Sequence, residues 1–152
     1  MADAEPLSVA GAVADALSRL GRATGRLGAA ADRVTYLLLA ILEREGPLRT
    51  GALAEATHAD PSTISRQIAR LVDDGLVRRT ADPADARATL LGITEAGQEH
   101  LDASRSRRNR ALAMLLAEWD PADREALREL LGRFVEDFEQ RLPEVRAQLD
   151  AD

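Results

Sequence analysis

The segment from Pro61 to Asp74 carries side chains that could read a double-stranded nucleic acid. At about 100° per residue, its polar side chains gather on or near one side of an expected helix. They are Ser62, Thr63, Ser65, Arg66 and Arg70. The planar guanidinium of Arg66 can donate to O6 and N7 of one guanine, while Ser62 and Thr63 can donate to bases or phosphates. Arg70, one turn further on, is placed for the phosphate backbone. Taken singly, each arginine is better explained as a solvated surface charge, so the functional interpretation depends on the surrounding elements.

A second pair with chemical potential is Asp85 and Arg87, which flank one residue in a polar segment. The Asp85 carboxylate could hold the Arg87 guanidinium in one rotamer while that group enters a narrow minor groove, where the negative potential is greatest. The alternative is a surface ion pair worth at most about 1 kcal/mol. The surrounding elements decide between these two interpretations.

The residues before Pro61 predict a short supporting helix next to the helix that begins at Pro61, which we call the reading helix. Thr50 can cap a short helix over Gly51–Thr57, and Asp60 can cap the next helix, which has Pro61 at its first position. Apolar side chains would hold that second helix on a core, namely Ile64, Ile68, Leu71 and Val72. This order of a short helix, a tight turn and a capped helix is typical of a helix-turn-helix.

After Gly75 the helical periodicity stops. Leu76–Thr80 and Arg87–Ile93 read as strands, and the acidic, proline-containing turn Asp82–Ala86 joins them. Two strands closed by a tight turn form a wing, so the segment from 48 to 94 predicts a winged helix-turn-helix.

Amphipathic helices flank this segment. The apolar spacing predicts helices over Leu7–Thr24, Ala31–Arg44, Thr94–Ala117 and from Pro121 to about Leu142, where Pro143 should kink or end the last one. The outer helices carry more apolar surface than a small lobe can bury. We therefore expect a homodimer, whose two reading helices would lie about 34 Å apart, one turn of the duplex.

The expected fold is mainly α with a small β-hairpin wing, in a single-domain protein. A dimerisation helix over residues 1–30 precedes the winged helix-turn-helix lobe of residues 31–94, and residues 95–152 supply further dimerisation helices. The length of 152 residues fits one compact domain. The net charge of −6 gives nucleic-acid binding no support, so the locally basic segment from 62 to 79 carries that argument.

Composition excludes several other classes. The chain has no cysteine, which rules out disulfides and thiol-based sensing. His58 and His100 lack the spacing of a metal site, so neither a metal nor a cofactor is expected. No glycine-rich phosphate loop or nucleophile-base motif indicates an enzyme. With no apolar run long enough for a membrane span and no basic leader, a cytoplasmic protein without a membrane partner is expected.

Several short motifs together resemble the MarR family of bacterial transcriptional regulators. The likeness covers nearly the whole chain, and its most specific part is Asp85-Ala86-Arg87 followed by Thr94-Glu95-Ala96-Gly97. The resemblance implies a triangular homodimer that binds a pseudopalindromic operator, with Arg87 as the wing arginine and Asp85 as the residue that orients it. It also implies a repressor that a small, often aromatic, anion releases from DNA.

A pocket for such an effector is expected between the dimerisation helices and the winged lobe, where binding could change the spacing of the reading heads. Its candidate lining residues are Arg33, Tyr36, His100, Arg105 and Met114. The main alternative function is a winged helix that contacts another protein and binds no operator. Steep weakening of binding by salt would distinguish operator binding from this alternative.

Overall fold

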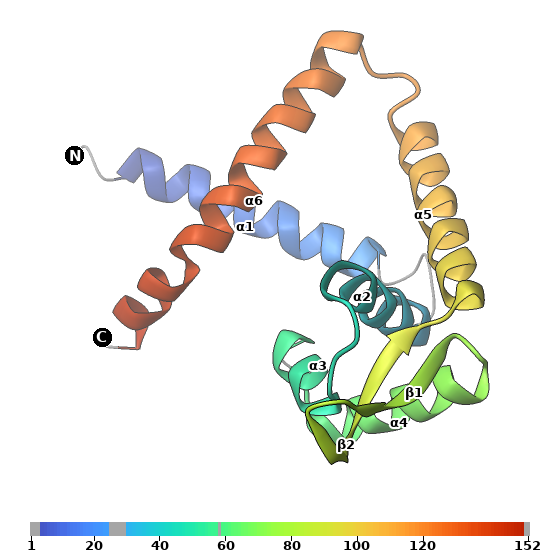
Figure 1. Ribbon diagram of the computed structural model, residues 1–152. Coiled ribbons are helices and arrows are strands. Elements are labelled where there is room, and N and C mark those ends of the chain that lie inside the picture. Colours follow the sequence, from blue (N-terminus) through green and yellow to red (C-terminus); the bar gives the residue numbers. More distant parts are fainter. Residues whose placement is uncertain (1–3, 25–29, 58, 151–152) are drawn as a thin grey trace. The chain divides into compact units, whose positions relative to one another are not determined.

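The computed structural model describes residues 4–24, 30–57 and 59–150 (Figure 1). Its elements, in chain order, are α1 (Ala4–Thr24), α2 (Ala30–Glu45), α3 (Thr50–Thr57), α4 (Pro61–Asp73), β1 (Val77–Asp82), β2 (Asp85–Ile93), α5 (Glu95–Leu115) and α6 (Pro121–Leu149). The predicted fold class, mainly α with one hairpin, is confirmed. We call α2 to β2 the winged lobe.

The chain divides into two compact units, Met1–Arg105 and Ser106–Asp152. The division therefore falls inside α5. The core belongs to the first unit, where α2, α3, α4 and both strands pack together. Its buried residues are Leu38, Leu39, Ile41, Leu42, Leu53, Ala54, Ile64, Ile68, Leu71, Val77, Leu91 and Leu101.

Local signals begin and end α4 as the sequence predicts. The Asp60 carboxylate accepts a hydrogen bond from the backbone amide of Thr63 at 3.0 Å, and Pro61 takes the first helical position. At the other end Gly75 has a positive φ of 73°. The amides of Gly75 and Leu76 donate to the carbonyls of Val72 and Leu71, which is the Schellman arrangement. Both ends of the helix are therefore fixed independently of any ligand.

The wing is an antiparallel pair in which Val77 lies opposite Ile93, with a register shift between Ala81 and Asp82. Leu48 forms an isolated antiparallel bridge with Leu91, in which the amide of each residue donates to the carbonyl of the other. The strands are longer at the turn than expected: β1 reaches Asp82 and β2 begins at Asp85, so the connection is two residues. The backbone bonds between Leu48 and Leu91 tie the wing to the segment before α3.

Several helix boundaries differ from expectation, and α1 begins three residues early, at Ala4. Thr50 is the first residue of α3 and not its cap, because the carbonyl of Arg49 already accepts from the amide of Leu53. Helix α5 ends at Leu115, two residues early, and α6 continues past Pro143 to Leu149. An exposed helix can tolerate such a proline because water can reach the carbonyl that loses its partner.

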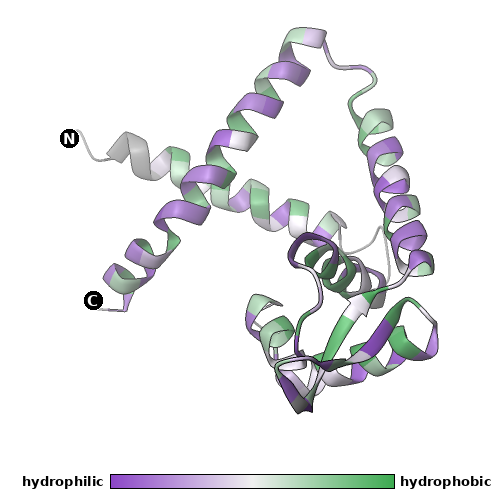
Figure 2. Ribbon diagram, in the orientation of Figure 1, coloured by the Kyte–Doolittle hydropathy of each residue, from purple (hydrophilic) through white to green (hydrophobic). Residues whose placement is uncertain are grey.

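Helices α1, α5 and α6 leave large apolar side chains uncovered, and those of α5 are Leu112, Met114 and Leu115. Along α6 they are Leu127, Leu130, Leu131, Phe134, Val135, Phe138, Leu142, Val145 and Leu149, and along α1 they are Val9, Val13, Leu17 and Leu20. Figure 2 shows that α6 carries apolar and strongly polar residues along its whole length. In the part of the chain described here, no helix is both long and apolar enough to cross a bilayer.

Candidate nucleic-acid interface

Helix α4 presents one buried and one exposed side. Ile64, Ile68 and Leu71 are at most 2% exposed and attach the helix to the core. All five polar residues expected to face nucleic acid are exposed, namely Ser62, Thr63, Ser65, Arg66 and Arg70. The structure thus brings the predicted residues together on one accessible surface of a helix that could enter a major groove.

The side chain of Arg66 lies back along the first turn of α4, against Ser62. Its Nε donates to the carbonyl of Ser62 at 3.3 Å, and its Nη2 lies 3.5 Å from the Ser62 hydroxyl. Both distances are at the long end for a hydrogen bond. The guanidinium therefore rests against its own helix and could leave these weak partners to meet a guanine edge.

The cap of α4 engages two of the predicted contact residues. The carboxylate of Asp60 accepts from the hydroxyl of Ser62 and from the amide of Thr63. These hydrogen bonds, the Ser62 one first, hold the pKa of Asp60 below its ordinary value. In the free protein the Ser62 hydroxyl proton is therefore directed into the cap, so Ser62 can donate to a base or phosphate only when it leaves Asp60.

The wing places Arg87 on the exposed hairpin, and its partner geometry differs from expectation. The Asp85 carboxylate accepts from the backbone amide of Arg87 at 3.1 Å. Its other oxygen lies 3.7 Å from Nη2 of Arg49. Among the described residues no ion pair joins Asp85 to the Arg87 guanidinium. A carboxylate two residues before an amide is well placed for this local hydrogen bond, so Asp85 orients the main chain at Arg87 and not its side chain.

Arg49 is a residue of this site that the sequence did not reveal. Its Nε and Nη2 donate to one oxygen of Asp82 at 2.9 and 2.6 Å, so a residue beside α3 is bonded to the wing. The available signal was weak: an arginine stands where α3 should have a capping residue, and an acid ends the first strand. Neither position predicts the other partner.

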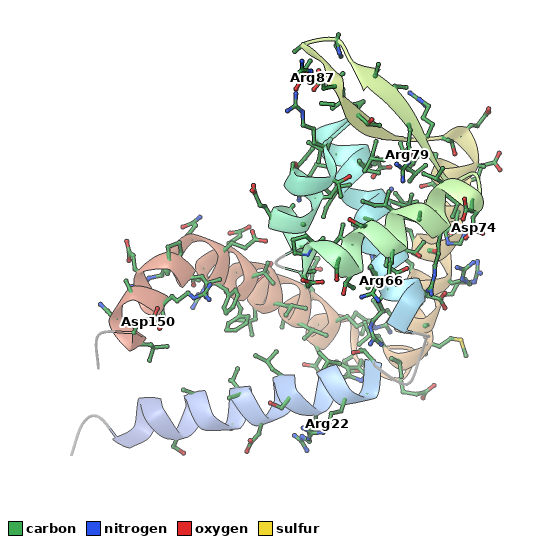
Figure 3. All side chains as sticks on the ribbon, turned by 90° about the horizontal axis from the view of Figure 1, so that it is seen from below. Arg22, Arg66, Asp74, Arg79, Arg87 and Asp150 are labelled. Atoms are coloured by element: carbon green, nitrogen blue, oxygen red, sulfur yellow. The ribbon has the colours of Figure 1, made fainter. Side chains whose placement is uncertain are left out.

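Two further arginines lie on β1. Nη1 of Arg78 donates to the carbonyl of Ile93 at 2.9 Å, which links the two strands. Arg79 is exposed on the same strand. Figure 3 labels Arg79 on the hairpin together with Arg87 near its turn, and Arg66 on α4 of the same lobe. The lobe therefore offers arginines from both the reading helix and the wing.

The candidate effector residues are only partly assembled. Arg105 in α5 pairs through both terminal nitrogens with the carboxylate of Glu43 in α2, to which the Gln98 amide also donates at 2.6 Å. Hydrogen bonds from Arg105 and Gln98 lower the pKa of Glu43 to about 2. Hydrogen bonds with Glu43 and then Tyr36 raise the pKa of Arg105. Tyr36 and Arg105 are thus neighbours, and Arg105 already has a carboxylate partner.

The other three candidates for an effector pocket have exposed side chains. Arg33 is exposed on α2 and His100 is exposed on α5. Met114, 79% exposed, belongs to the second unit. His58 lies outside the described residues, within which no three histidine, aspartate or glutamate side chains are grouped as metal ligands would be.

A capped helix with an exposed polar side, braced by a shorter helix and followed by an arginine-bearing hairpin, defines a winged helix-turn-helix DNA-binding protein. The chain belongs to the MarR family of transcriptional regulators: residues 33–89 match that family. It is 38% identical to the HTH-type transcriptional regulator YxaD of Bacillus subtilis over 80% of this chain and 82% of that protein.

Solved structures share this fold. RV1404 from Mycobacterium tuberculosis matches with a TM-score of 0.71 and 25% identity over 84% of this chain and 92% of that one. BpsR of Bordetella bronchiseptica, whose DNA binding is regulated by 6-hydroxynicotinic acid, matches in fold with a TM-score of 0.57 and 22% identity over 84% of this chain and 98% of that one. The repressor NicR of Pseudomonas putida is 27% identical over 70% of this chain and 67% of its own length.

Proposed function

We propose that this protein is a homodimeric repressor that binds a pseudopalindromic operator and is released from it by a small aromatic anion. In this proposal α4 lies in the major groove, where Arg66 reads a base and Ser62, Thr63, Ser65 and Arg70 contact bases or phosphates. Arg87 enters the adjacent minor groove, with Asp85 fixing its main chain. The observation that carries the proposal is the exposed polar side of α4 next to an arginine-bearing wing.

The uncovered apolar side chains support a dimer. Soluble monomers seldom expose contiguous apolar surface on this scale, and α1 and α6 together expose more than a dozen large apolar residues. We therefore assign residues 1–30 and 95–152 to dimerisation and residues 31–94 to DNA binding. A two-fold dimer would present its two reading helices to the two halves of one operator.

The effector part of the proposal rests on relatives and on one cluster. NicR is a repressor, and the DNA binding of BpsR responds to an aromatic carboxylate. In this chain Tyr36 and Arg105 could offer a ring and a guanidinium to such an anion, in competition with Glu43. Arg33, His100 and Met114 remain predictions for the same site.

Selection of bound sequences from random duplexes tests the function. We expect an enriched sequence with two-fold symmetry, and a logarithmic affinity that falls linearly with the logarithm of the salt concentration. The affinity for the selected duplex is then measured for Arg66→Ala and, as a control, for Arg128→Ala, whose side chain pairs with Glu125 on α6. Only the first substitution should weaken binding.

If no duplex sequence is enriched and salt hardly weakens the binding of duplexes, the alternative of a winged helix that contacts another protein is favoured. Titration of the bound duplex with 6-hydroxynicotinate and related aromatic carboxylates tests the effector. Release at micromolar ligand by none of these compounds would contradict that part of the proposal without affecting operator binding.

A further inference from the structure

We propose that Arg49 is a positioning residue for the wing, which locks the hairpin to the start of α3 and so presents Arg87 to DNA without itself contacting a phosphate. The inference rests on the proposed role of Arg87 in the minor groove. It assigns to Arg49 a function in operator recognition that acts through the wing.

The bond between Arg49 and Asp82 joins parts of the chain that lie 33 residues apart. Both Nε and Nη2 of Arg49 donate to Oδ2 of Asp82, and a guanidinium held by two donors has little freedom to rotate. The Asp82 side chain is 9% exposed, whereas that of Arg49 is 50% exposed. The carboxylate is thus enclosed at the wing, and the arginine covers it from outside.

The second oxygen of Asp82 shapes the hairpin turn. Oδ1 accepts from the backbone amide of Ala84 at 2.8 Å, across the two-residue connection between the strands. This position follows the register shift between Ala81 and Asp82, where the regular ladder of backbone hydrogen bonds is interrupted. Side-chain bonds from Asp82 therefore replace the ladder at the point where the hairpin would otherwise fray.

Asp85 extends the same network to the residue that is expected to contact DNA. One of its oxygens accepts from the amide of Arg87, and the other lies 3.7 Å from Nη2 of Arg49. Arg49 is consequently shared by two carboxylates, one fixing the turn and one fixing the main chain at Arg87. Loss of the guanidinium would leave these two acids to repel each other across the turn.

The local charge argues against a direct phosphate contact by Arg49. One guanidinium beside two carboxylates leaves a net charge of about −1 at this point, which a phosphate would avoid. The exposed guanidinium of Arg87 has no such acid partner among the described residues. We therefore separate a structural arginine at the base of the network from a binding arginine at its end.

A double-mutant cycle on operator affinity tests this division. The proteins are the wild type, Arg49→Gln, Arg87→Ala and the double variant. Arg44→Gln is the control because Arg44 is exposed and, among the described residues, pairs only with its neighbour Glu45. We expect Arg49→Gln to weaken binding by about tenfold in the wild type, within the range that coupled residues show, and by less than about twofold in the Arg87→Ala background.

Equal losses in both backgrounds would overturn the inference and make Arg49 an independent DNA contact. Hydrogen exchange of the free protein supplies a test that needs no DNA. The amides of Ala84 and Arg87 should exchange faster in Arg49→Gln and in Asp82→Asn than in the wild type, while amides of the α4 core stay protected. Unchanged exchange at both amides would overturn the inference even if operator binding were never observed, and the protected core shows that each variant is folded.

Discussion

Gly97, in the first turn of α5, lies so close to the carbonyl oxygen of Leu76 that a Cβ atom at Gly97 would stand 2.2 Å from it. The neighbouring Thr94 explains the approach. Its hydroxyl donates to the carbonyl of Gly75 at 2.7 Å and accepts from the amide of Gly97 at 3.0 Å. The motif Thr94-Glu95-Ala96-Gly97 thus caps α5 and fastens it to the turn that ends the reading helix.

Substitution Gly97→Ala should destabilise the first unit by about 1 to 3 kcal/mol, the ordinary cost of overpacking, because the opposing atom is backbone and cannot rotate away. Urea unfolding measures the change. Gly51→Ala in α3 is the matched control, since beyond its chain neighbours and the backbone of its own helix no described atom lies within 4 Å of a Cβ there. That helix position should gain up to about 1 kcal/mol. Similar effects of the two substitutions would contradict the packing argument.

Substitution Arg66→Ala should remove about 1 to 3 kcal/mol of discrimination at one base pair in each half of the operator, because a two-pronged contact with guanine is lost. Competition between operators that differ at single positions measures it. In Arg70→Ala, a phosphate contact should be lost instead, so binding should weaken equally on all sequences and the salt slope should fall by about one. Unaltered sequence preference in Arg66→Ala would show that α4 recognises bases through other residues.

Substitution Arg87→Ala should weaken binding chiefly where A·T-rich flanks narrow the minor groove, since the attraction of a guanidinium depends on the groove's negative potential. Paired operators with A·T-rich and G·C-rich flanks measure this preference. Arg128→Ala serves as the control on α6. An equal loss on both kinds of flank would argue against insertion into the minor groove.

Substitution Phe134→Arg should dissociate the proposed dimer, because it places a charge in the apolar stripe of α6 beside Phe138, whose ring centroid lies 6.2 Å away. The molecular mass measured by light scattering should then fall from twice the chain mass of 16.4 kDa to the mass of a single chain. Operator affinity should fall with it. Glu136→Arg introduces the same side chain on the polar side of the helix and should remain dimeric. A wild type of 16.4 kDa at micromolar concentration would itself refute the dimer.

Acid should weaken the link between α2 and α5. The pKa of Glu43 lies at about 2 in the folded protein, below its ordinary 4.5, so the ionised form is favoured by folding. The stabilisation is therefore complete above about pH 4.5 and is lost as the pH falls through 2. Glu43→Gln should be less stable than the wild type at pH 7, and urea midpoints of the two proteins should converge toward pH 2.

Glu99→Gln, an exposed substitution on the helix that carries Arg105, is the control and should match the urea midpoint of the wild type at pH 7. A constant difference between Glu43→Gln and the wild type across the whole range would mean that packing, and not the ion pair, explains the loss.

Much of the reading helix could be predicted because its signals are local. Asp60 and Pro61 begin α4, Gly75 ends it, and the apolar spacing of Ile64 and Ile68 decides which side is buried. Asp85 shows where such reasoning fails: its carboxylate has several possible partners at similar distance along the chain, and the hairpin backbone selects the amide of Arg87 over the guanidinium.

The sequence alone determined the order of elements, the exposed polar side of α4 and the family, since each depends on residues within a few turns of one another. Only the tertiary structure decided which charged side chains meet. Arg49 reaches Asp82 over 33 residues, and Arg105 reaches Glu43 over 62. Long charged side chains on surfaces can satisfy many partners, so their pairing follows from how whole elements pack together.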